Sequence, residues 1–221
     1  MRRVKICLTQ RVLIVDTKGA VGIGTLIIFI AMIMVAGIAA SVIIQTMNSL
    51  EQQALETGQQ TLKEVSSGLR VTHVNGYCNG TKITEIGIFI RTTAGSDEID
   101  ITNTFIRLSD TNNEVILNFT SNVFSSSVTN GLFGTLNSSL LTSTTYGLMV
   151  ISDVDNSCTS TSPIINDDDM VVLLVNSTQC FSGISSRTKV FGNVIPQFGI
   201  SGGISFTTPS TYIHTIIELQ P

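Results

Sequence analysis

The strongest constraint on this chain is a long apolar run near its N-terminus, residues 20–44, with the sequence AVGIGTLIIFIAMIMVAGIAASVII. No charged residue lies between Lys18 and Glu51. As a helix, the run would extend roughly 37 Å, against about 30 Å for the hydrocarbon core of a bilayer. A helix that is apolar on every side is stable inside a membrane or among other helices. The run therefore predicts a segment that is surrounded by a membrane, by other helices, or by each in turn.

Residues 1–19 form a basic leader that ends directly before the apolar run. Its cations are Arg2, Arg3, Lys5, Arg11 and Lys18, and they favour the cytoplasmic side of a membrane. An ordinary secretory signal is cut after its apolar region, at small residues. Here the small residue comes first, so cleavage between Gly19 and Ala20 would leave the apolar run on the mature protein. The alternative is a permanent single-span anchor with a cytoplasmic stub.

After the apolar run, the helical pattern becomes one-sided. Apolar or small residues recur at steps of three and four, at Leu50, Ala54, Leu55, Gly58, Leu62, Val65 and Leu69. This pattern predicts a helix that continues to about Ser67, next to the helix-stopping Gly68. Small residues such as Ala36 and Ala40 would let neighbouring helices approach closely. We expect residues 20–68 to form one helix, either in a filament core or as an anchor that continues into a stalk.

Residues 69–221 have the pattern of a β domain. Short apolar or alternating segments are separated by turn residues such as Asn75-Gly76. The candidate strands are residues 70–74, 82–91, 99–108, 114–119, 146–152, 170–175, 189–195, 203–207 and 213–219. With no long helix between them, they favour a sandwich or barrel-like domain. The predicted fold is α+β, a long N-terminal hydrophobic helix followed by an all-β, sandwich-like (Ig-like) head.

The composition of the chain indicates which partners it can bind and in which compartment it works. Charged residues make up 13% of the chain and the net charge is −4, which argues against nucleic acid as a partner. The Ser-, Thr-, Asn- and Gly-rich head indicates a surface outside the cell. Loss of the leader would remove Cys7 and leave Cys78, Cys158 and Cys180, which either include one disulfide or remain buried thiols. Their spacing does not suit a zinc site.

Two groups of residues in the head could carry modifications or ions. Four N-x-S/T sequons, the acceptors of N-linked glycans, occur at Asn79, Asn118, Asn137 and Asn176. Asn137 has the most loop-like context and Asn118 the most strand-like. A Ser/Thr-rich loop is bracketed by Asp153, Asp155, Asp167, Asp168 and Asp169. Such carboxylates are weak calcium candidates, and because EF-hand spacing is absent, a solvated acidic loop is the simpler interpretation.

Catalytic motifs are absent from the sequence. It has no P-loop, no dinucleotide-binding fingerprint and no nucleophile elbow. His73 and His214 lie in or near the first and last candidate strands. We expect no enzymatic activity and no cofactor, apart from the weak interpretation of a structural calcium ion.

The order of basic leader, glycine and apolar run resembles the class III signal of type IV pilin-like proteins. Residues 18–32, KGAVGIGTLIIFIAM, strongly resemble the N-terminus of archaeal flagellins, or archaellins. Bacterial pilins have Glu at the fifth mature position, where this chain has Gly24. Archaellin leaders often have a second basic residue, where this chain has Thr17. The similar segments in the head are residues 80–83, 100–104, 106–110, 195–199, 206–209 and 217–221, and the likeness is thinner from 122 to 169.

The resemblance implies an extracellular structural subunit that polymerises into the archaeal flagellum used for swimming. It implies a precursor in the cytoplasmic membrane, cut by a prepilin peptidase that recognises Lys18 and Gly19. Other archaellins, an assembly ATPase and a membrane platform complex would be the further partners, and N-glycosylation would be common. An adhesion pilus subunit of the same assembly class remains an alternative. A single-span anchored enzyme or binding domain is another, for which a catalytic constellation should be present.

Overall fold

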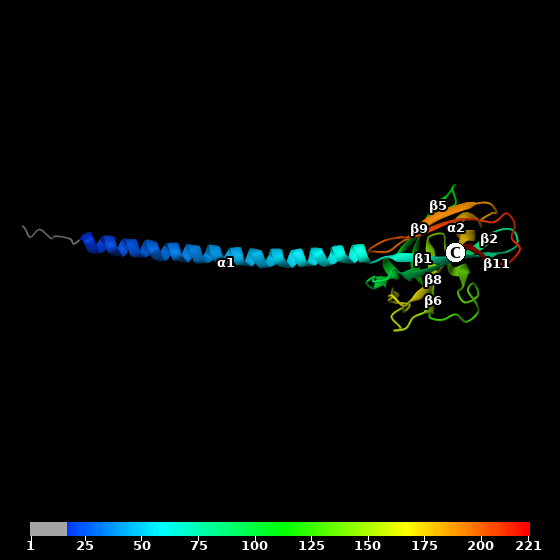
Figure 1. Ribbon diagram of the computed structural model, residues 1–221, viewed down its shortest axis with the longest axis horizontal. Coiled ribbons are helices and arrows are strands. Elements are labelled where there is room, and N and C mark those ends of the chain that lie inside the picture. The colour runs from blue at the N-terminus through cyan, green and yellow to red at the C-terminus, as the bar shows by residue number, and fades with distance from the viewer. Residues whose placement is uncertain (1–16) are drawn as a thin grey trace, which may run out of the picture. The chain divides into compact units, whose positions relative to one another are not determined.

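The computed structural model describes residues 17–221, with side chains from Val21 onward. Most of the expected leader, residues 1–19, lies outside the described residues. The chain divides into two compact units, Met1–Thr57 and Gly58–Pro221, which are described separately. A single helix, α1 (Thr17–Ser66), begins in the first unit and ends in the second (Figure 1). Its last residue is one position from the predicted end at about Ser67.

Nine strands of the second unit form one sheet. In sheet order they are β10 (Gly202–Thr207), β9 (Lys189–Ile195), β4 (Phe105–Ser109), β5 (Glu114–Ser125), β6 (Thr145–Ser152), β8 (Met170–Asn176), β2 (Ile83–Thr92), β1 (Leu69–Cys78) and β11 (Ile216–Gln220). Every neighbouring pair is antiparallel except β5 and β6, which are parallel. A separate two-stranded sheet pairs β3 (Ile99–Asp100) with β7 (Ile164–Ile165). The β-rich head expected from the sequence is confirmed.

The sheet curls, so that strands at its two ends come together. β10 contacts both β1 and β11, and a Cβ built at Gly202 of β10 would lie 3.2 Å from the Leu69 carbonyl oxygen of β1. One face of the sheet therefore encloses the main core, to which alternate residues of each strand contribute. Ile86, Ile88 and Ile90 of β2 are completely buried there. The strands gather around this core in Figure 1.

A second apolar cluster covers the outer face of the central strands β6 and β8. Met149 of β6 and Val172 and Leu174 of β8 pack there against Leu136 and Leu141 of the β5–β6 connection. This connection must be long because β5 and β6 run parallel and cannot be joined by a tight hairpin. β8 is consequently buried on both faces, which explains its continuous apolar sequence.

The strand pattern was largely correct, and the differences have local causes. The segment predicted as one strand over residues 99–108 is interrupted by the 3₁₀ helix η1 (Ile101–Asn103), because the Asp100 carboxylate accepts a hydrogen bond from the Thr102 N–H. The buried Tyr146 hydroxyl donates to the carbonyl oxygens of Ile101 and Thr104 on either side of that turn.

Besides η1, three short elements were not predicted. They are β7, the helix α2 (Ser177–Phe181) and the 3₁₀ helix η2 (Ser138–Leu140). Their lengths of two, five and three residues give no periodic signal. The last strand, predicted over 213–219, begins only at Ile216.

Candidate functional site

The side chains of α1 are apolar on every side of its first half. Ile27, Ile28 and Phe29 point in three directions about 100° apart, and they are 61%, 63% and 62% exposed. Among the described residues, this is the one helix long and apolar enough to cross a membrane. Full burial of each large apolar side chain would contribute about 1.5–3 kcal/mol. This half of the helix therefore needs lipid or other helices around it.

Small residues interrupt the apolar surface of α1. Ala31, Ala36 and Ala39 line a shallow groove together with Ile28 and Met32. Lipid provides no hydrophobic drive for two apolar helices to associate, so close backbone packing has to supply the attraction. The groove offers a surface into which another helix can pack.

The end of α1 is fixed within the second unit by several polar contacts. Lys63 Nζ lies 3.0 Å from a carboxylate oxygen of Asp97, and the Asp97 N–H donates to the Ser67 hydroxyl. The Ser67 carbonyl accepts from the N–H of Ile200 at 2.9 Å. The Gly68 N–H donates to the Ser96 hydroxyl. These contacts hold the chain at the point where the helix gives way to β1.

The four sequons have different surroundings. Asn79, Asn118 and Asn137 are exposed, Asn118 within β5 and Asn137 as the cap of η2. Asn176 is buried. Its Nδ2 donates to the carbonyl oxygen of Ser138 at 2.9 Å, while its Oδ1 accepts from two N–H groups at the start of α2. In the folded head, the nitrogen that would carry a glycan at Asn176 is therefore occupied.

Three of the five aspartates come together. Carboxylate oxygens of Asp153, Asp155 and Asp169 lie within 4.8 Å of one another, whereas Asp167 and Asp168 are exposed and do not belong to this group. The Asp153 and Asp155 carboxylates accept hydrogen bonds from the backbone N–H groups that follow them in the same loop. The loop thus positions two carboxylates beside a third from the start of β8.

Asp169 is the least satisfied member of this group. It is 1% exposed; one carboxylate oxygen accepts from the Asn166 N–H and the other has no hydrogen-bond partner. Burial and the charges of Asp153 and Asp155 raise its pKa, while hydrogen bonds from Ser157 lower the pKa of Asp155. Several oxygen ligands of this kind suit a hard cation such as calcium. The sequence could not single out these three aspartates, because their burial depends on the fold.

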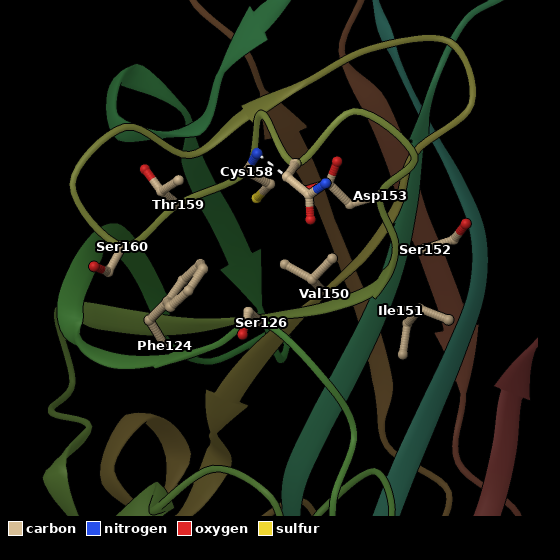
Figure 2. Close-up of a pocket in the computed structure, with 10 residues that line it drawn as sticks. Phe124, Ser126, Val150, Ile151, Ser152, Asp153, Cys158, Thr159 and Ser160 are labelled. Atoms are coloured by element: carbon tan, nitrogen blue, oxygen red, sulfur yellow. Dashed lines mark hydrogen bonds between the residues drawn. The ribbon is translucent and has the colours of Figure 1, made fainter.

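A pocket of about 540 Å³ adjoins the acidic group. Figure 2 shows Phe124, Val150, Asp153 and Cys158 around it. Cys158 is buried, and burial and the neighbouring carboxylates raise the pKa of its thiol to about 12. Cys78, Cys158 and Cys180 are all free thiols. A protonated thiol is a poor nucleophile, so this pocket offers no activated cysteine.

A long helix that is apolar on every side of its first half and joins a β-rich head is the architecture of filament subunits with an N-terminal core helix. The profile of the family described as archaeal-type flagellin matches residues 19–206. Flagellin B2 of Methanocaldococcus jannaschii is 41% identical over 209 residues, covering 92% of this chain and 95% of the relative. Flagellin B4 of Pyrococcus abyssi is 40% identical over 219 residues, covering 92% and 99%. The chain belongs to the archaeal-type flagellin family.

Solved structures agree with this assignment. The crystal structure of archaeal flagellin FlaB1 from Methanocaldococcus jannaschii matches with a TM-score of 0.63 and 33% identity, covering 70% of this chain and 97% of that chain. The archaeal flagellum of Methanospirillum hungatei matches with a TM-score of 0.63 over 90% of this chain and 99% of that chain, and at 14% identity it supports the fold alone. The chain is a structural subunit of the archaeal flagellum, or archaellum.

Proposed function

We propose that the chain is inserted into the cytoplasmic membrane as a precursor, is cut between Gly19 and Ala20, and then packs α1 among copies of itself in the extracellular filament. The observation that carries this proposal is the exposure of apolar side chains on every side of the first half of α1. In lipid and in a helical bundle alike, these side chains stay out of water. The transfer between the two therefore costs little hydrophobic free energy.

The proposed partners follow from this route and from the family. A prepilin peptidase would recognise Lys18 and Gly19, of which the structure describes only the backbone. An assembly ATPase and a membrane platform would supply the work of extraction and rotation, since no nucleotide-binding motif occurs in this sequence. Other archaellins would share the filament.

The head contributes two further proposals. We propose glycans at Asn79, Asn118 and Asn137, whose exposure leaves them accessible to a transferase. We also propose that Asp153, Asp155 and Asp169 hold a calcium ion, supported by the oxygen of Asp169 that has no hydrogen-bond partner. The ion would neutralise three crowded carboxylates and tie their loop to β8.

N-terminal sequencing of filaments sheared from cells tests the main proposal. We expect the mature chain to start at Ala20, and a Gly19→Val variant to remain in the membrane fraction at full length. A protein recovered only as a detergent-soluble monomer with residues 1–19 intact would instead be a single-span anchored protein. Cells without the gene should lose swimming, and loss of surface attachment alone would point to an adhesion pilus.

A further inference from the structure

Two arginines lie directly opposite each other at the start of the head. Arg70 of β1 and Arg91 of β2 are paired across neighbouring antiparallel strands, so their side chains emerge on the same face about 5 Å apart at Cβ. Like charges in this position repel each other. Neither guanidinium has an ion pair or a hydrogen bond with any other side chain described between Val21 and Pro221. An anion bound at this pair would balance their charges.

Arg91 also has a buried donor without an acceptor. Its Nε atom is shielded from solvent and makes no hydrogen bond. Buried donors in native proteins nearly always have a partner, so an orphan of this kind indicates a group that joins from outside the chain. A charged donor favours an ionised acceptor, and a guanidinium binds a carboxylate through two parallel hydrogen bonds.

A pocket of about 250 Å³ lies at this pair, lined by Arg70, Arg91, Thr92, Thr93, Ala94 and Asp167. It is smaller than the usual range for drug-sized ligands, about 300–1,000 Å³, and is suited to one side chain. Asp167 does not fill the role of the counter-ion, because it makes no ion pair with either arginine and instead accepts a hydrogen bond from the Gly95 N–H.

The second half of α1 carries the complementary charge. Lys63, the cation in its last turn, is already paired with Asp97, and Glu64 accepts a hydrogen bond from Gln60. Glu51 and Glu56 are exposed and have no ion pair among the described residues. If α1 packs among copies of itself as proposed, these two carboxylates are free to pair with a cation of a neighbouring copy.

We propose that Arg70 and Arg91 form an intersubunit site that binds a carboxylate, Glu51 or Glu56, on α1 of a neighbouring copy. The site would fix how far one subunit is displaced along its neighbour, because the arginine pair has to lie opposite the carboxylate that it binds. This inference rests on the proposed packing of α1 in a filament.

Charge reversal tests the site in the full-length chain expressed in cells. Arg70→Glu and Arg91→Glu should each lower the yield of sheared filaments about ten-fold or more, because a carboxylate then faces a carboxylate. Lys189→Glu makes the same charge change at an exposed position, the first residue of β9, and should leave the yield unchanged. Combining Arg70→Glu with Glu51→Arg or with Glu56→Arg should restore filaments in one of the two pairs. Arg70 is exposed, so its variant tests the site even if Arg91→Glu fails to fold.

Two results would overturn the proposal. One is a filament yield for Arg70→Glu equal to that of Lys189→Glu. The other combines two observations: neither Glu51→Arg nor Glu56→Arg restores filaments, and phosphate raises the melting temperature of the unaltered chain but not that of Arg70→Ala. The site would then hold a free anion and not a carboxylate of a neighbouring copy. Failure of the filament function itself would be distinguishable, because the unaltered chain would then form no filaments.

Discussion

The effect of Asp169 on the stability of the head should depend on whether a cation is bound beside it. Its carboxylate is buried, lies beside two others, and has one oxygen without a hydrogen-bond partner. A raised pKa in the folded head means that the ionised form is disfavoured there relative to the unfolded chain. Without a cation, Asp169 thus stabilises the fold most at low pH, and this stability is lost as the pH rises through its folded pKa.

Calcium should reverse this behaviour. At neutral pH in EDTA, we expect Asp169→Asn to melt at or above the temperature of the unaltered chain, because the substitution removes a crowded charge. With calcium a hundred-fold above its Kd, the unaltered chain should gain about 2.7 kcal/mol, or roughly 5–10 °C for a head of this size. Thermal unfolding in detergent measures both, with the exposed Asp168→Asn as control. If the unaltered chain melts at the same temperature with calcium as in EDTA, the cation site is refuted.

Asn176 differs from the other sequon asparagines because its side chain is buried and its amide nitrogen already donates a hydrogen bond within the head. Asn176→Gln should leave the glycan mass unchanged and destabilise the head by about 1–3 kcal/mol, because the cap of α2 and the bond to Ser138 are lost. Asn118→Gln, at an exposed position of β5, should lower the intact mass of filament subunits by one glycan with little effect on melting. A glycan found on Asn176 would mean that transfer precedes folding.

At the scale of elements, the end of α1 depends on a close backbone approach. Gly199 has φ +86°, and a Cβ there would lie 2.0 Å from the Ser67 carbonyl oxygen. Gly199→Ala should therefore destabilise the head by about 2 kcal/mol or more. Gly203→Ala, on β10 where nothing lies within 4 Å, should be neutral or slightly stabilising. Equal melting temperatures for the two variants would show that this approach is unimportant.

The groove on α1 makes a different prediction, because its effect should appear only on assembly. Ala36→Leu should leave membrane insertion and cleavage intact but reduce filament yield strongly, since the larger side chain holds neighbouring backbones apart. Ala36→Ser, which stays small, serves as the control. Immunoblots of membrane and sheared fractions separate the two steps, and normal filaments from Ala36→Leu would place the helix contacts elsewhere.

Most of these elements could be predicted from the sequence, but not how they come together. The predicted helix corresponds to α1, and eight of the nine predicted strand segments each correspond to one strand of the large sheet, because periodicity is local information. The ninth, residues 99–108, is broken by a side-chain hydrogen bond of Asp100 that periodicity does not register. The parallel β5–β6 pair, the contact of β10 with β1 and the gathering of Asp153, Asp155 and Asp169 all join distant segments, and a single sequence carries no signal for these contacts.

For the whole molecule, the balance between apolar and charged contacts decides how a filament comes apart. Salt screens surface charges and does not weaken apolar packing. We expect sheared filaments to persist in about 1 M sodium chloride, which screens charged contacts only. Detergent should dissociate them into monomers, because detergent molecules replace the neighbouring helices that surround α1. Light scattering follows both treatments. Dissociation by salt alone would mean that charged contacts of the heads hold the polymer together.

The apolar surface on all sides of α1 also limits where growth can occur. A subunit released into water would expose the apolar side chains of α1 and aggregate before it reached a free filament end. On the proposed route through the membrane, new copies reach the filament directly from lipid, and we expect elongation at the cell surface. A filament broken far from the cell should then regain its length only at its base.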